Sequence, residues 1–224
     1  IRDRVMNKRF AIFDMDGTLV DSMAFWQRLG REFLASQNIT ERVDEVLERI
    51  IPMTMIESAA LFIQEFGLSR TQEDLAAEMN AIMERHYRSD IPLKPGVPEY
   101  LNMLRSNGVK MCVASATPVH LIRACLTRLG VAEYFSFLIS CDEAGAGKDR
   151  PGVYLLASEK LEAAPQETAV YEDALYAAKT AKKAGFYTIG VYDKCAAENW
   201  EALKALSDET IRDWKEPVNQ YNNK

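Results

Sequence analysis

The most informative stretch of this chain covers residues 10–22, which read Phe10-Ala11-Ile12-Phe13-Asp14-Met15-Asp16-Gly17-Thr18-Leu19-Val20-Asp21-Ser22. The apolar run ends abruptly at two acidic side chains, Asp14 and Asp16, and Gly17 follows at once. Apolar residues that end at a glycine turn are typical of a buried strand, so we predict a strand at Ala11–Phe13. In open parallel sheets, ligands bind beyond the carboxyl ends of the strands. Both aspartates are therefore predicted to lie where ligands bind.

Asp14 and Asp16 form a pair of like charges that a strand end seldom keeps for stability alone. A divalent cation would offset their repulsion, because hard cations take oxygen ligands. The pattern Asp-x-Asp-Gly also occurs in plain surface turns, and it opens calcium-binding loops. A calcium loop needs a closing Glu, but here the closing position is Phe25. The calcium loop is excluded, and the apolar lead-in favours a functional site over a plain turn.

The chain has 224 residues, of which 48% are hydrophobic and 27% are charged, as is usual for a globular protein. The net charge of −6 and the lack of a basic run argue against a nucleic-acid partner. No apolar run reaches the roughly 20 residues that cross a membrane, and the first residues lack the apolar stretch of a signal peptide. We expect a monomeric, cytoplasmic protein with no membrane partner, whose natural start is Met6.

Cysteine and histidine usage excludes two further classes of site. The four cysteines are widely spaced and form no Cys-x-x-Cys pair: Cys112, Cys125, Cys141 and Cys195. Reduced thiols fit this spacing better than a disulfide framework does. Only two histidines are present, His86 and His120, so a histidine-rich metal site is not expected.

Residues 22–89 have helical periodicity throughout and no convincing strand. Thr54 and Glu57 have the spacing of a capping box, which predicts a helix start there. Another helix is predicted from about Thr71 to about Tyr87, and Pro92 then breaks the helical run.

Beyond Gly96 the pattern alternates between helix and strand, and glycines follow the helices. Strands are predicted over 109–114, 134–139, 169–171 and 186–191, with helix ends at Gly108, Gly130 and Gly185. This alternation predicts an α/β fold, with a Rossmann-like, mostly parallel sheet as its core. Residues 1–20 and 92–224 would form that core, and 21–91 an inserted all-α cap. Because both joints lie near the aspartates, we expect the cap to act as a lid. The tail over 216–224 is predicted to be frayed.

Three further predicted strand ends carry polar side chains. The strand ending at Ala114 delivers Ser115, the Gly-rich stretch after the next strand delivers Lys148, and another strand ends in Glu172 and Asp173. Each has a plain interpretation, such as a serine turn or an acidic helix cap. Their order along the chain is more informative than any one of them.

An acidic pair, a serine, a lysine and a second acidic pair, in this order, resemble the four motifs of the haloacid-dehalogenase-like phosphohydrolases. The helical segment after the first motif resembles their β-phosphoglucomutase-like branch. The resemblance implies that Asp14 is the nucleophile, forming an aspartyl-phosphate, and that Asp16 is first general acid and then base. It implies that Ser115 binds the phosphoryl oxygens and that Lys148 pairs with both phosphate and nucleophile.

The resemblance also implies a Mg²⁺ cofactor and a small phosphorylated metabolite as substrate, hydrolysed as a phosphate monoester. Asp14, the Asp16 carbonyl and Asp173 would hold the ion, with Glu172 in direct or indirect contact. The chain departs from the family pattern after Lys148, where Asp-Arg-Pro-Gly replaces Pro-x-Pro-Asp, and at Ala174 and Ala177. These departures bear on the shape of the lysine loop and on the bonds around Asp173.

Several other functions compete with this interpretation. A P-loop kinase needs Gly at 142 and Ser or Thr at 149, but both positions are Asp. A dehalogenase would not need Asp16, and a phosphonate hydrolase would need a lysine in the insert, where 22–93 has none.

Two alternatives stay open. A sugar-phosphate mutase would use the same aspartates, with insert arginines holding a second phosphate, for which the candidates are Arg28, Arg31, Arg49 and Arg85. A phospho-accepting signalling module would also use an acidic pocket and a lysine, although such modules lack a long helical insert.

Overall fold

The computed structural model describes residues 7–224, which fall into two compact units. One unit is the continuous segment Met23–Asp90, and the other combines the residues up to Ser22 with Ile91–Lys224. The boundaries expected from the sequence lie one or two residues away from these. The expected start at Met6 lies outside the described residues. None of the described helices has both the length and the apolar character that crossing a membrane requires.

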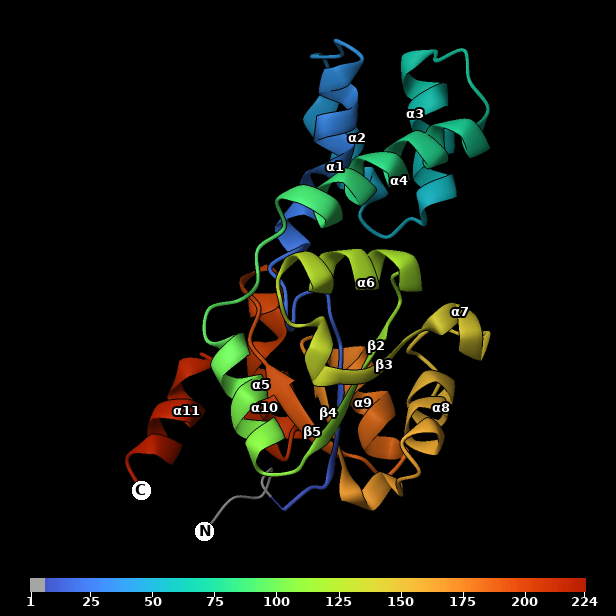
Figure 1. The fold of residues 1–224 in the computed structure, drawn as a ribbon. Helices are drawn as coiled ribbons and strands as arrows, with labels where there is room; N and C mark the ends of the chain where they lie inside the picture. Colours follow the sequence, from blue (N-terminus) through green and yellow to red (C-terminus); the bar gives the residue numbers. More distant parts are fainter. Residues whose placement is uncertain (1–6) are drawn as a thin grey trace. The chain divides into compact units, whose positions relative to one another are not determined.

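The Met23–Asp90 unit is built from helices, as its periodicity predicted (Figure 1). They are α1 (Met23–Ser36), α2 (Val43–Ile50), α3 (Met55–Phe66) and α4 (Gln72–Ser89). Thr54 caps the N-terminus of α3, because its hydroxyl accepts a hydrogen bond from the Glu57 amide at 3.2 Å. The rings of Phe33 on α1 and Phe62 on α3 stack at a centroid distance of 6.0 Å, and both side chains are buried. The unit therefore has an apolar core of its own.

The other unit alternates strands and helices. Its strands are β1 (Phe10–Phe13), β2 (Lys110–Ser115), β3 (Phe135–Ser140), β4 (Thr168–Glu172), β5 (Tyr187–Val191) and β6 (Glu209–Ile211). Its α-helices are α5 (Val97–Ser106), α6 (Val119–Arg128), α7 (Cys141–Ala144), α8 (Gly152–Lys160), α9 (Leu175–Lys183), α10 (Trp200–Leu206) and α11 (Lys215–Asn222). Short 3₁₀ helices lie at η1 (Ala132–Tyr134), η2 (Pro165–Glu167) and η3 (Lys194–Asn199).

These strands form one six-stranded sheet in the order β3-β2-β1-β4-β5-β6, in which every neighbouring pair is parallel. The predicted parallel α/β fold is confirmed. Strand β1 lies in the middle, with Phe13 opposite Val113 of β2 and Tyr171 of β4. The residues that follow β1, β2 and β4 therefore emerge side by side at one edge of the sheet.

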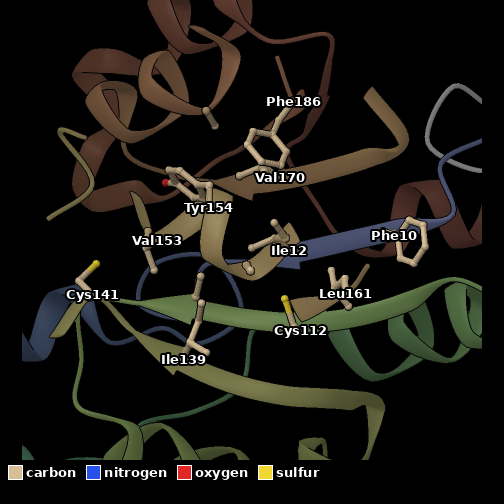
Figure 2. Close-up of a cluster of buried hydrophobic side chains, with 13 residues drawn as sticks. Phe10, Ile12, Cys112, Ile139, Cys141, Val153, Tyr154, Leu161, Val170 and Phe186 are labelled. Atoms are coloured by element: carbon tan, nitrogen blue, oxygen red, sulfur yellow. The ribbon is translucent and has the colours of Figure 1, made fainter. Parts of the chain in front are cut away.

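Alternate side chains of these strands enter cores on opposite faces of the sheet. On one face, Ile12, Cys112 and Val170 pack against α8 and α9 in a buried cluster that also contains Tyr154 (Figure 2). On the other face, Phe13 stacks on Tyr171 at 4.2 Å. Helices thus cover a sheet that is apolar on both sides, which is the usual arrangement of parallel sheets.

Two details differ from the expectation. The tail is not frayed, since Lys215–Asn222 form helix α11. Trp214, which is buried, anchors the start of that helix, and the Asn107 amide donates to the Tyr221 hydroxyl at 3.3 Å.

Strand β6 has only three residues, Glu209–Ile211, which are too few to produce a recognisable alternation. The helix ends predicted at Gly108, Gly130 and Gly185 are confirmed, because each of these glycines has a positive φ angle.

Candidate active site

Asp14 follows β1 directly and continues its ladder, because its amide donates to the Tyr171 carbonyl at 3.1 Å. Its carboxylate is buried and contacts both Lys148 and Thr18. The Lys148 ammonium donates to Oδ1 at 2.7 Å, and the Thr18 hydroxyl donates to Oδ2 at 2.9 Å. Gly17 makes the intervening turn with a φ of 78°, a conformation that favours glycine. The turn after β1 thus folds Thr18 back onto Asp14.

Lys148 joins two carboxylates inside the protein. Its Nζ lies 2.7 Å from Asp14 and 2.6 Å from Oε1 of Glu172, and the lysine side chain is only 4% exposed. Burial alone lowers the pKa of Lys148, but the charges of Asp14 and Glu172 outweigh it and raise that pKa above its usual range. The ammonium group therefore stays protonated. The unusual Asp-Arg sequence after Lys148 does not prevent these contacts.

Glu172 ends β4, which lies next to β1, and Asp173 follows it directly. Oxygen atoms of Asp14, Glu172 and Asp173 all lie within 4.8 Å of one another, and all three side chains are buried. Burial and the Asp14 charge raise the pKa of Glu172 to about 8, against the opposing effect of Lys148. Burial and Asp14 also raise the pKa of Asp173 well above its usual value. If all three carboxyl groups were ionised, their negative charge would exceed that of the single ammonium group, and this repulsion contributes to the raised pKa values.

A divalent cation fits that excess. Hard cations such as Mg²⁺ take oxygen ligands, and the cluster of Asp14, Glu172 and Asp173 offers carboxylate oxygens from adjacent strand ends. The Thr18 hydroxyl lies 2.9 Å from Asp14 and 3.1 Å from Asp173. A hydroxyl has one hydrogen, so it satisfies one of these carboxylates at a time. When Thr18 donates to Asp14, which Lys148 also contacts, a cation beside Asp173 would stabilise the charged form of that carboxyl group, which supports a metal site here.

The Asp16 side chain does not belong to this cluster. Its carboxylate accepts hydrogen bonds from hydroxyl groups: Ser22 donates to Oδ1 at 2.7 Å, Thr117 to Oδ2 at 2.7 Å, and Ser115 lies 3.4 Å from Oδ2. Ser115 ends β2, is buried, and accepts a hydrogen bond from the Thr117 amide at 3.1 Å. The structure thus brings Asp16 and Ser115 together. The backbone carbonyl of Asp16 as a metal ligand stays a prediction.

Sequence reasoning missed several residues that contact the site. The buried Tyr154 of α8 donates its hydroxyl to Glu172 Oε1 at 2.6 Å, although it belongs to none of the four motifs. Thr18 lies within the stretch 10–22 and Thr117 follows Ser115 by two residues, but no role was predicted for either. Where the family usually has a serine, Ala174 starts α9 without a side-chain hydrogen bond. The site therefore depends on more hydroxyl groups than the motifs indicate.

The helical unit has a hollow of about 920 Å³, lined by residues of α1, α2, α3 and α4 that include Trp26, Leu47 and Met79. Of the arginines considered for a second phosphate, Arg31 pairs with Asp44, and Arg49 pairs with Glu65 at 3.0 Å. The guanidinium of Arg28 lies over the ring of Phe25 at 4.9 Å. Arg85 is exposed.

Comparison with known sequences gives a consistent family. Residues 9–185 match the family of haloacid dehalogenase-like hydrolases. A phosphorylated carbohydrates phosphatase from Thermotoga maritima is 27% identical over 178 residues, which cover 80% of this chain and 82% of that protein. Hexitol phosphatase B from Escherichia coli is 30% identical over 186 residues, covering 81% of this chain and 82% of that protein.

Solved structures also resemble this chain. A Thermotoga maritima protein provisionally assigned as a beta-phosphoglucomutase superposes with a TM-score of 0.81 at 25% identity, covering 96% of this chain and 99% of the other. The beta-phosphoglucomutase of Clostridium difficile has a TM-score of 0.67 at 21% identity and covers 97% of this chain, which shows a shared fold.

Proposed function

Because this chain belongs to the haloacid dehalogenase-like hydrolases, we propose that it is a Mg²⁺-dependent phosphatase that hydrolyses a small phosphorylated metabolite through an aspartyl-phosphate. The observation that carries the proposal is the contact of Lys148 with both Asp14 and Glu172 beside a buried acidic cluster. A buried carboxylate next to an ammonium group suits attack on an anionic substrate, since the lysine attracts the phosphate and stabilises its oxygens.

The proposed reaction has two steps. In the first, a carboxylate oxygen of Asp14 attacks phosphorus, the bond from phosphorus to the leaving oxygen breaks, and Asp16 gives that oxygen a proton. In the second, Asp16 takes a proton from water, the water oxygen attacks phosphorus, and the bond to Asp14 breaks, releasing inorganic phosphate. Asp16 is supported in this role by its separation from the acidic cluster and by the hydroxyl groups of Ser22 and Thr117 that orient it.

The remaining residues hold the substrate and the cation. Ser115 would bind the phosphoryl oxygens together with Lys148, since its hydroxyl lies beside Asp16. Asp14, Glu172 and Asp173 would hold Mg²⁺, with the Asp16 carbonyl as a further ligand. A bound Mg²⁺ supplies positive charge that offsets the repulsion between a carboxylate and a phosphate dianion.

Relatives support a phosphorylated carbohydrate or polyol as the substrate, because two of them are named as phosphatases of phosphorylated carbohydrates and of hexitols. A mutase is the second candidate, on the likeness to the Thermotoga maritima structure. The names of both relatives favour the hydrolase. A cytoplasmic location and a monomeric state stay predictions.

A panel of phosphorylated sugars, polyols and short organic acids tests the proposal, with and without Mg²⁺. Release of inorganic phosphate that stops with a chelator and returns with Mg²⁺ would support it. Conversion of a sugar phosphate into its isomer would favour the mutase. A phosphoprotein that persists for hours would favour the signalling module. Asp16→Asn should slow turnover and accumulate phosphoenzyme on Asp14, and unchanged turnover would remove Asp16 from its role.

A further inference from the structure

Lys94 is a second largely buried lysine, outside the four motifs. It follows the joint after the helical unit, and its side chain is 12% exposed. Its ammonium group donates to the carbonyl of Gly17 and, at 3.0 Å, to the carbonyl of Tyr192. Its Nζ also lies 2.9 Å from Oδ2 of the buried Asp193. An ammonium group has three donors, and three oxygens surround this one.

The first of these contacts fixes the turn after β1. Gly17 and Thr18 share the peptide group whose carbonyl meets Lys94. The next carbonyl, that of Thr18, accepts a hydrogen bond from Trp214 Nε1 at 3.2 Å. The backbone is therefore held on both sides of Thr18. Its side chain, which is fully buried, then lies between Asp14 and Asp173.

The other contacts tie that turn to the end of β5. Tyr192 and Asp193 follow β5 directly, and β4 lies between β1 and β5 in the sheet. Lys94 thus links the ends of two strands that flank the strand carrying Asp173. The link joins the turn that supplies Asp14 and Thr18 to the far side of the acidic cluster.

Stability alone is a poor reason for this arrangement. A buried ion pair often contributes no more than apolar side chains of similar volume would, because desolvating two charges is costly. Asp193 Oδ2 is close to Lys94 but has no aligned hydrogen-bond partner among the described residues. The ion pair therefore compensates charge, whereas the aligned hydrogen bonds go to the Gly17 and Tyr192 carbonyls.

We propose that Lys94 is a positioning residue, which holds the Gly17–Thr18 peptide so that the Thr18 hydroxyl stays between the carboxylates of Asp14 and Asp173. This inference rests on the proposed function, because the cluster it serves is the candidate Mg²⁺ site. Residues that orient metal-binding side chains without touching the metal usually contribute about 10–100-fold to metal affinity or activity.

The test compares full-length variants by Mg²⁺ titration calorimetry, by kcat and KM, and by thermal unfolding without metal. Lys94→Met should weaken Mg²⁺ binding and lower kcat by about 10–100-fold, with a smaller change in KM. Lys94→Arg keeps donors for both carbonyls and should restore part of the Mg²⁺ affinity. The matched control is Lys194→Met, since Lys194 is 65% exposed and pairs loosely with Asp21. The control should bind Mg²⁺ like the wild type.

Asp193→Asn separates positioning from charge pairing. It keeps the oxygens of Gly17 and Tyr192 for Lys94, so it should lower the melting temperature and leave Mg²⁺ affinity within about threefold, well below the loss expected of a positioning residue. If it weakens Mg²⁺ binding as much as Lys94→Met does, the ion pair matters rather than the carbonyl contacts, and the proposal is wrong.

A double variant covers the case in which Lys94→Met does not fold. Lys94→Met with Asp193→Leu removes both buried charges, so it should fold and still bind Mg²⁺ at least tenfold more weakly, the lower end of the expected range. Wild-type affinity in that variant would overturn the proposal. Failure of the wild type to hydrolyse any monoester would refute the proposed function instead, and the Mg²⁺ affinities would still decide the role of Lys94.

Discussion

The two units of this protein differ in the burial of their least exposed ion pairs. In the core unit, the side chains of Lys148, Glu172 and Asp14 are 4%, 1% and 9% exposed and contact one another. In the helical unit, Arg31 pairs with Asp44, and their side chains are 56% and 83% exposed. Charges removed from water depend on their partners, whereas hydrated pairs contribute little. The difference indicates that the buried charges around Lys148 are kept for chemistry, whereas the exposed pairs of either unit contribute little to stability.

Asp14→Asn should have the largest effect on activity. The variant loses the proposed nucleophile, so kcat should fall on the order of 10⁴-fold or more. Folding should persist, because Lys148 retains Glu172 as a partner and one repelling carboxylate is gone. Steady-state assays and circular dichroism check both statements. Glu45→Gln, which removes an exposed carboxylate of the helical unit, is the control and should keep full activity. Activity retained by Asp14→Asn would end the proposed mechanism.

Lys148→Met should have the largest effect on stability. It leaves the buried carboxylates of Asp14 and Glu172 without their cation, which costs about 3–5 kcal/mol of unfolding free energy. Urea denaturation without metal measures this loss. Arg31→Met breaks an exposed pair in the helical unit and should cost under about 1 kcal/mol. Equal losses in the two variants would show that the contrast between the units has no energetic basis.

Two isosteric variants sharpen the contrast within the core unit. Tyr154→Phe removes the hydroxyl that donates to Glu172, and Tyr100→Phe removes a buried hydroxyl that pairs with Tyr171 at 2.6 Å. Each should lower the unfolding free energy by about 1–3 kcal/mol, because each leaves a buried polar group short of a partner. Only Tyr154→Phe should also weaken Mg²⁺ binding, by about tenfold in calorimetry. A similar loss in both variants would mean that Tyr154 acts only through packing.

The smallest expected effect is a pH dependence of stability caused by His86, which lies in the helical unit. Its ring nitrogens contact Glu32 at 2.9 Å and Asp90 at 2.8 Å. Burial lowers the pKa of His86, but these two carboxylates outweigh it and raise that pKa overall. A raised pKa in the folded state stabilises the protein fully below the unfolded value of about 6.5, and this contribution is lost as the pH rises through the folded pKa.

The measurement for His86 is the difference in melting temperature between the wild type and His86→Gln across a pH series. The difference should be greatest in acid and should shrink as the pH rises. A difference that grows with pH would show that the two carboxylates do not control this histidine.

The sheet could be predicted because its signals are local. Apolar runs such as residues 10–13, each ended by turn residues, identify strands without knowledge of their partners. Alternation with helices then leaves a parallel sheet as the simplest architecture. The family could be predicted because the first motif is compact and specific. Strand β6 and helix α11 were missed because neither has a strong apolar pattern of its own.

The supporting residues of the site could not be predicted in this way. Thr18 contacts Asp173 across 155 positions of sequence, and Lys94 contacts the Tyr192 carbonyl across 98. Such contacts depend on strand order and on the conformation of a turn, and no local sequence pattern encodes either. Tyr154 is a helix residue, and its hydroxyl contacts the site only because the fold places Glu172 within hydrogen-bond distance. Motifs therefore identify the charged groups, and the structure identifies what orients them.

The central position of β1 has a consequence for how the protein is made. Phe13 ends β1 and Thr168 begins β4, its neighbour in the sheet, 155 positions later. At the usual 5–20 residues per second, a ribosome needs roughly 8–30 s to deliver that partner. Throughout this interval one edge of the nascent β1 lacks its neighbour, whereas the helical segment Met23–Asp90 is completed within the interval and is free to fold before β4 appears. Chaperones that protect exposed strand edges are therefore expected to bind the emerging chain during that interval.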